Sequence, residues 1–227
     1  MSYAPVPFES PWYRPLLQPL VVGSNLAVAA WMYPCWRTAR TLWRPPLDVL
    51  SARLADAARP VIYYTWHAYE LLGACAFRDV PEPLMPVAIG HDGVRSRMLQ
   101  QAFRWCGVSI WVYRRQSPIR PKQQIIDLLR SGRGRVALAA DAGGPYRRVK
   151  PGLPEIAQAA DALLVPFVIR GRGVLPLRRP VRYDVPLPFC SLVLYYGAPF
   201  DGRDATVAAC QRALEDQEGR ARQSALG

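Results

Sequence analysis

The chain has 227 residues, of which about half are hydrophobic and one fifth are charged. This composition fits a globular domain with a sizeable core, and it excludes a disordered chain and a polytopic membrane protein. The 29 basic residues exceed the 17 acidic ones and give a net charge of +12, which favours anionic partners such as phospholipid headgroups, phosphorylated ligands or nucleic acid.

The first 46 residues differ in composition from the rest of the chain. Residues 16–33 are apolar over about the length of a membrane span, but polar residues and a proline interrupt them. Aromatic and basic residues follow, namely Trp36, Arg37, Arg40, Trp43 and Arg44. This arrangement favours an element seated at a membrane interface, with a true span or plain packing against the core as alternatives. We therefore expect a membrane-associating segment over residues 1–46 and an α/β domain over residues 47–227.

From residue 47 onward, helical patterns alternate with β-branched apolar runs. Strands are predicted over 61–65, 86–90, 108–113, 135–140 and 163–169, and helices over 47–59, 68–78, 94–106, 121–131 and 153–161. This alternation predicts an α/β fold in which helices flank a single, mostly parallel sheet. The Arg- and Pro-rich residues 170–189 are expected to form a long loop, followed by a strand over 191–196 and a helix from about residue 205.

His67, one of only two histidines, lies where the strand over 61–65 ends and a helix begins. In α/β folds, ligands bind at the carboxyl ends of strands. Histidine also exchanges a proton near neutral pH, so this position suits a general base. The alternative is a histidine that only caps the helix or packs beneath Trp66.

A second candidate site is the turn over residues 141–152, between a predicted strand and a predicted helix. Gly143 and Gly144 expose backbone N–H groups there, and Arg147, Arg148 and Lys150 add three positive charges. Backbone amides near a helix start and guanidinium groups both bind phosphate. The turn therefore predicts a site for a phosphate-bearing ligand, with a basic surface turn as the alternative.

Six short blocks follow one another in a fixed order along the chain. They are Trp66-His67, His91-Asp92-Gly93, residues 113–117 with Arg114 and Arg115, Asp141 to Arg147, Leu164 to Pro166, and Pro186 to Phe189 followed by Tyr196 to Pro199. In this order the blocks resemble the lysophospholipid acyltransferase-like superfamily, and specifically a small bacterial branch with a Trp-His start and an Asp-Gly-Pro-like turn. The resemblance covers roughly residues 55–202.

The resemblance implies an α/β acyltransferase seated peripherally or monotopically on the cytoplasmic face of the inner membrane. It would move a fatty acyl group from acyl-CoA or acyl carrier protein to a hydroxyl of a lysophospholipid-like or other lipid acceptor. His67 would be the general base, and Arg114, Arg115 and the block from Asp141 to Arg147 would contact the anionic, phosphate-bearing acceptor. The expected partners are membrane lipids and the acyl donor, with no cofactor.

The chain departs from the superfamily pattern at the acid that supports the histidine. The superfamily has an acid five residues after the histidine, where this chain has Leu72. Glu70, three residues after His67 and close to it on a helical face, is the first choice for this role. Asp92 and Asp141 are the other candidates.

Acyl transfer from a thioester needs a base for the acceptor hydroxyl and donors for the tetrahedral oxyanion. The Gly143 and Gly144 amides or an arginine would be these donors. Direct attack by the acceptor is expected, because the sequence has no Gly-x-Ser-x-Gly elbow and no cysteine clearly paired with His67. The five scattered cysteines form no C-x-x-C pair, so no metal site is expected.

Two other functions remain open from the sequence. A non-catalytic lipid-binding relative would have kept the fold and lost the acid partner of the histidine. A nucleic-acid binder is disfavoured, because the basic residues are not interleaved with aromatic residues that would stack on bases.

Overall fold

The computed structural model describes residues 14–55, 59–92, 100, 102–132, 134–142, 144–178 and 182–224. The α-helices are α1 (Arg14–Thr38), α2 (Leu47–Ala55), α3 (Glu70–Ala76), α5 (Pro121–Arg130), α6 (Gly152–Ala159) and α7 (Val207–Gln223). The strands are β1 (Arg40–Arg44), β2 (Val61–Thr65), β3 (Val87–His91), β4 (Ile110–Tyr113), β5 (Arg135–Ala139), β6 (Leu163–Leu177), β7 (Tyr183–Tyr196) and β8 (Phe200–Asp201). Short 3-10 helices occur as η3 (His67–Tyr69), η4 (Glu82–Leu84) and η5 (Gly202–Asp204).

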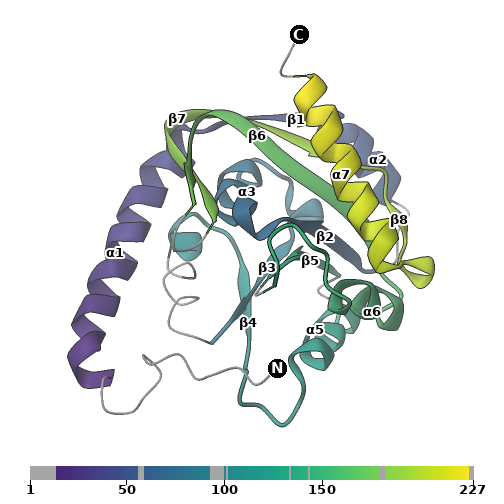
Figure 1. The fold of residues 1–227 in the computed structure, drawn as a ribbon, viewed down its shortest axis with the longest axis horizontal. Helices are drawn as coiled ribbons and strands as arrows, with labels where there is room; N and C mark the ends of the chain where they lie inside the picture. The colour runs from purple at the N-terminus through teal and green to yellow at the C-terminus, as the bar shows by residue number, and fades with distance from the viewer. Residues whose placement is uncertain are drawn as a thin grey trace.

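In the part of the chain that the structure describes, the strands form one sheet in the order β1-β7-β6-β2-β5-β3-β4, with β8 paired to β6 (Figure 1). The five strands β6, β2, β5, β3 and β4 run parallel to their neighbours within this group. β7 runs antiparallel to β6, and β1 runs parallel to β7. The predicted α/β fold with a mostly parallel sheet is thereby confirmed.

β2 is the most enclosed strand of the sheet, because all five of its residues are buried. It lies between β5 and β6, and helices cover the sheet around it, with α3 packed against β7 and α7 against β6. A strand buried on both faces is rich in β-branched and other large hydrophobic residues and lacks charge, as is true of residues 61–65. The site residues that follow β2 therefore start from a fixed position.

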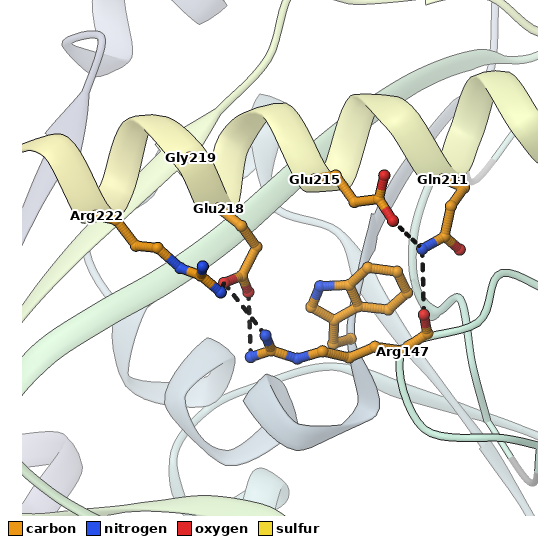
Figure 2. A pocket seen from close by; sticks show the side chains of 7 residues that line it. Arg147, Gln211, Glu215, Glu218, Gly219 and Arg222 are labelled. Atoms are coloured by element: carbon orange, nitrogen blue, oxygen red, sulfur yellow. Dashed lines mark hydrogen bonds and ion pairs between the residues drawn. The ribbon is translucent and has the colours of Figure 1, made fainter.

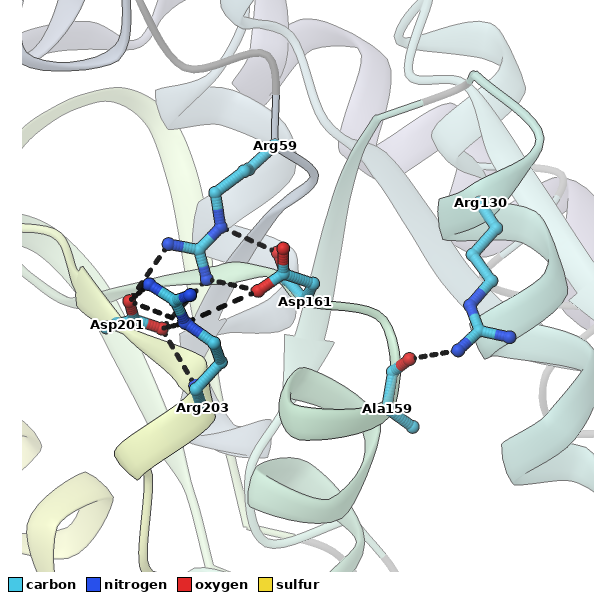
Figure 3. Close-up of polar contacts among 6 residues, drawn as sticks. All are labelled: Arg59, Arg130, Ala159, Asp161, Asp201 and Arg203. Atoms are coloured by element: carbon cyan, nitrogen blue, oxygen red, sulfur yellow. Dashed lines mark hydrogen bonds and ion pairs between the residues drawn. The ribbon is translucent and has the colours of Figure 1, made fainter.

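An ion-pair network lies at the amino-terminal end of β2, away from the end that leads to His67 (Figure 3). Arg59 pairs with Asp161 and with Asp201, in both cases at 2.8 Å, and Arg203 lies 2.6 Å from Asp201. The hydrogen bond from Arg59 and those from Arg203 hold the pKa of Asp201 well below its usual range. This network connects the amino-terminal end of β2 to the segments that begin β6 and form β8.

The prediction of a long loop over 170–189 is wrong. β6 continues to Leu177, and β7 begins at Tyr183. The two strands pair antiparallel from Leu177 and Tyr183 to Phe167 and Tyr196, with an irregularity next to Gly173 (φ 70°). Prolines and arginines favour a loop in the sequence, but a strand pair at a sheet margin or bulge accepts prolines that a central strand would not. Residues 179–181 lie outside the described residues.

Residues 16–33 lie within α1, which packs against β7 and buries Ala29, Met32 and Cys35. β1 extends the sheet beside β7. The described part of the N-terminal segment thus supplies a helix and a strand to the domain. None of the helices in the described ranges has both the length and the apolar character needed to cross a bilayer.

The remaining predicted helices are present with shifted ends. The helix predicted over 68–78 is observed as η3 followed by α3, and the polar C-terminal helix begins at Val207, where Thr206 Oγ1 accepts a hydrogen bond from Ala209 N–H at 3.1 Å. The helix predicted over 94–106 falls largely outside the described residues, although residue 100 and residues 102–105 are helical.

Candidate active site

His67 begins η3 directly after β2, so it lies at the carboxyl end of the most enclosed strand. Its ring Nδ1 lies 2.8 Å from Glu70 Oε1, in a contact that is close but bent, because the ring N–H does not point along the line between the two atoms. A proton on Nδ1 facing Glu70 leaves Nε2 as the acceptor nitrogen. The imidazole is 31% exposed, so an incoming substrate can reach it.

The side chain of Asp141 links the backbone of His67 to the backbone of the basic turn. It is 4% exposed, and its two oxygens accept hydrogen bonds from His67 N–H at 2.7 Å and Arg147 N–H at 2.8 Å. The end of β5 is in turn held to β2 by a hydrogen bond from Ala140 N–H to Thr65 O at 2.7 Å. A buried carboxylate with two amide donors is strongly stabilised, so Asp141 places the backbone of His67.

The surroundings of His67 act on its pKa in opposite directions. Burial is the largest influence and lowers the pKa, whereas the contact with Glu70, the charge of Glu70 and the charge of Asp141 raise it. The net result is a pKa above the ordinary value for histidine. A raised pKa makes the neutral imidazole a stronger base, but the neutral form then predominates only at a pH above that raised pKa.

The side chain of Arg147 extends across the basic turn toward α7 (Figure 2). Its guanidinium donates to Tyr69 Oη at 2.8 Å and to Glu218 Oε2 at 3.3 Å, and the Tyr69 hydroxyl donates to Glu218 Oε1 at 2.6 Å. Arg170 also pairs with Glu218. The charge of Arg147 is therefore partly compensated by a buried carboxylate.

A cleft of about 310 Å³ lies between α7 and this turn. It is lined by Trp66, Arg147, Gln211, Glu215, Glu218, Gly219 and Arg222, and Figure 2 shows the α7 residues facing Arg147 across it. Gln211 fastens the turn to α7, because it accepts a hydrogen bond from Val149 N–H at 2.9 Å and donates to Arg147 O at 3.2 Å. The cleft thus adjoins the residue that precedes His67.

Asp92 and the Arg114–Arg115 pair lie close together after β3 and β4, also at the carboxyl-terminal ends of the parallel strands. Asp92 Oδ1 accepts a hydrogen bond from Arg115 N–H at 3.2 Å, and Gln124 bonds both backbone groups of Arg114. Both arginine side chains are exposed. Asp92 thus supports the turn after β4, whereas Glu70 contacts the His67 ring.

The remaining residues of the basic turn differ in their surroundings. Gly144 N–H donates to Asp141 O at 3.0 Å, so this amide already has an acceptor within the turn. Lys150 crosses over Gly144, where an added Cβ would lie 2.2 Å from Lys150 Cε. Arg148 is exposed, and Gly143 lies outside the described residues.

Three residues at the site were not predicted from the sequence, namely Tyr183, Tyr69 and Glu218. The Tyr183 ring lies 4.7 Å from the His67 ring, centroid to centroid, and its hydroxyl donates to Glu70 Oε2 at 3.3 Å. No local sequence pattern predicts these contacts, because Tyr183 is 113 positions from Glu70 and Glu218 is 149 positions from Tyr69.

No protein-family model matches the chain, and no curated protein matches it in sequence. Among solved structures, the chain is similar to the crystal structure of the 1-acyl-sn-glycerophosphate (LPA) acyltransferase, PlsC, from Thermotoga maritima. The TM-score is 0.51 and the sequence identity 11%, and the match covers 92% of each chain. At this identity the likeness concerns the architecture, so the chain shares the fold of a glycerophosphate acyltransferase.

Proposed function

We propose that the chain is an O-acyltransferase that transfers a fatty acyl group from acyl-CoA or acyl carrier protein to a hydroxyl of a lysophospholipid-like acceptor. The observation that carries the proposal is the His67 imidazole at the carboxyl end of β2, with Nδ1 facing Glu70 at 2.8 Å and Nε2 left to accept a proton. The shared fold with a glycerophosphate acyltransferase supports it.

In the proposed reaction, His67 Nε2 removes the proton from the acceptor hydroxyl while the hydroxyl oxygen attacks the thioester carbonyl carbon. Glu70 stabilises the imidazolium that forms. The tetrahedral intermediate then expels the thiolate, which takes the proton from His67. An arginine is the proposed oxyanion donor, because Gly144 N–H already donates to Asp141 O.

The charges around Glu218 support an anionic, phosphate-bearing acceptor. Arg147 and Arg170 contact this carboxylate directly, and Arg222 lies 3.9 Å from it. These three guanidinium groups exceed the two carboxylates of the cleft, Glu218 and Glu215, by one positive charge. Guanidinium groups bind phosphate in a bidentate manner, so this surplus suits a lysophospholipid headgroup.

The exposed apolar residues near α1 support seating at a membrane interface, which we propose to be the cytoplasmic face of the inner membrane. Leu26 and Tyr33 on α1 are exposed, and Phe189 is 79% exposed with its backbone at φ 62°. Phe189 N–H donates to Thr38 Oγ1 at 2.7 Å, which places it beside the carboxyl-terminal end of α1. Exposed Arg37 adds positive charge for anionic lipid.

The test is acyl transfer by purified protein on vesicles that contain lysophosphatidic acid. The donor is radiolabelled acyl-CoA in one assay and acyl carrier protein that carries a radiolabelled acyl group in the other. His67→Ala should reduce the rate about 10²- to 10⁴-fold, the usual contribution of a general base. The matched control is His91→Ala, which removes the other histidine and should retain activity.

Two outcomes would contradict the proposal. A folded His67→Ala protein that works at the normal rate would remove the mechanism. Wild-type protein that binds the acceptor but transfers nothing from either donor would indicate the non-catalytic, lipid-binding alternative.

A further inference from the structure

Tyr183 is the first residue of β7, where it pairs with Leu177 of β6 in the outer part of the hairpin. The hairpin returns this residue to the carboxyl end of β2, where its ring packs against His67 and its hydroxyl reaches Glu70. We propose that Tyr183 is a positioning residue for the His67–Glu70 pair. The inference rests on the function proposed above and adds a residue from a distant segment to the site.

Both carboxylate oxygens of Glu70 have a partner at the site. Oε1 lies 2.8 Å from His67 Nδ1, and Oε2 accepts the Tyr183 hydroxyl at 3.3 Å. Glutamate has several rotatable bonds, and a carboxylate held at only one oxygen can turn away from its partner. A donor on the second oxygen restricts that rotation, so the hydroxyl of Tyr183 keeps Oε1 facing the ring.

The imidazole is itself restrained by the Tyr183 ring. Nδ1 lies 2.8 Å from Glu70 Oε1, so a large rotation of the imidazole would separate the two atoms. The Tyr183 ring packs against the imidazole at 4.7 Å and an interplanar angle of 49°, which limits this rotation. Among the described residues, the charged groups that act on the pKa of His67 are Glu70 from α3 and Asp141 from the turn after β5, and the Tyr183 hydroxyl of β7 reaches the imidazole through Glu70.

Two consecutive residues of the hairpin contact the basic turn and the His67–Glu70 pair. Arg182 places its guanidinium carbon 4.4 Å from the centre of the Tyr146 ring, which belongs to the basic turn. Tyr183 contacts His67 and Glu70. This cation–π contact anchors the start of β7 beside the basic turn, so the position of Tyr183 is set by the fold.

The experiment follows the titration of the two histidine rings by NMR, with the His67 signal assigned by its persistence in His91→Ala. The chain has only two histidines, so the spectrum is simple, and no substrate is required. Tyr183→Phe keeps the ring and removes the hydroxyl. The matched control is Tyr113→Phe, because the Tyr113 ring lies 6.0 Å from the ring of the other histidine, His91.

In Tyr183→Phe the pKa of His67 should fall, in the same direction as in Glu70→Gln but by less, because Glu70 becomes able to turn away. The same variant should lose about two- to threefold in kcat with an unchanged KM, less than Glu70→Gln, because the hydroxyl acts on the imidazole only through Glu70. Its thermal midpoint should stay near that of the wild type. Tyr113→Phe should leave the His67 titration unchanged.

A Tyr183→Phe protein in which His67 titrates as in the wild type would overturn the inference and leave Tyr183 a packing residue. This readout is independent of activity. If His67 shifts in Tyr183→Phe while the wild type transfers no acyl group, the proposed function fails and the positioning role stands. If transfer depends on His67 but its titration ignores Tyr183, the positioning role alone fails.

Discussion

Replacement of Glu70 by Gln tests whether the carboxylate beside His67 works in the reaction. Gln keeps the length of the side chain and leaves a neutral amide oxygen near Nδ1, which lies 2.8 Å from Glu70 Oε1 in the wild type. A hydrogen bond to a charged group contributes about 1.5–3 kcal/mol and a neutral one about 0.5–1.5 kcal/mol. The imidazolium should thus lose about 1–1.5 kcal/mol of stabilisation, and kcat should fall about 5- to 10-fold.

The pH dependence of Glu70→Gln gives a second, independent readout. Neutral imidazole is the active base, so the wild-type rate should be lost as the pH falls through the pKa of His67, which lies above the ordinary value of about 6.5. In Glu70→Gln the influence of burial, which lowers this pKa, remains, while that of Glu70, which raises it, is gone. The acid limb should therefore move to lower pH.

The assay is the initial rate of acyl transfer at saturating donor and acceptor between about pH 5 and 9. Asp92→Asn is the matched control, since Asp92 bonds to Arg115 N–H and should leave the acid limb in place. A Glu70→Gln enzyme with the wild-type kcat and an unmoved acid limb would refute the reasoning. A shift in Asp92→Asn instead would assign the supporting acid to Asp92.

Three further predictions concern the backbone anchor, the basic turn and the membrane surface. Asp141→Asn should cost about 1.5–3 kcal/mol in urea unfolding, because Asn offers one acceptor oxygen to two backbone N–H groups; an unchanged midpoint would count against the anchor. Arg148→Ala should raise the KM for a phosphate-bearing acceptor about tenfold or more without changing the thermal midpoint. Arg147→Ala should raise this KM too, and it should also lower the thermal midpoint, because it leaves Glu218 with fewer partners. Unchanged kinetics in both variants would exclude these arginines from the phosphate site. Phe189→Ser should reduce flotation with anionic vesicles about tenfold and leave the thermal midpoint unaffected, since the side chain is 79% exposed; equal flotation would exclude Phe189 from the membrane surface.

The sequence was sufficient for the fold because its strongest signals were local. The run over 61–65 consists of β-branched and aromatic residues without a charge, as is typical of a strand buried on both faces, and the structure buries all five residues. The three-residue spacing from His67 to Glu70 also predicts proximity, and the ring and carboxylate are 2.8 Å apart. These relations depend on neighbours in the chain, so the sequence contains them.

The features that the sequence did not reveal depend on pairing between distant segments. β1 has the sequence Arg40-Thr-Leu-Trp-Arg44, whose aromatic and basic residues were interpreted as flanking a membrane-associating element. It forms a strand because it pairs with β7. The outer part of the β6–β7 hairpin is rich in proline and arginine, so its strands are recognisable only by their mutual pairing. Tyr183 and Glu218 reach the site through such pairing and packing.

The double role of Asp141 also constrains the order in which the molecule acquires activity. Its bond to His67 N–H joins residues 74 positions apart, and it can form only after β5 has docked beside β2. Closing so long a loop costs chain entropy before the contact returns any free energy, and such non-local contacts make folding slow. Helices can form early, but the catalytic geometry exists only in molecules whose parallel strands have reached their final register. Recovery of activity during refolding is therefore a measure of completed sheet assembly, and helix content alone does not report it.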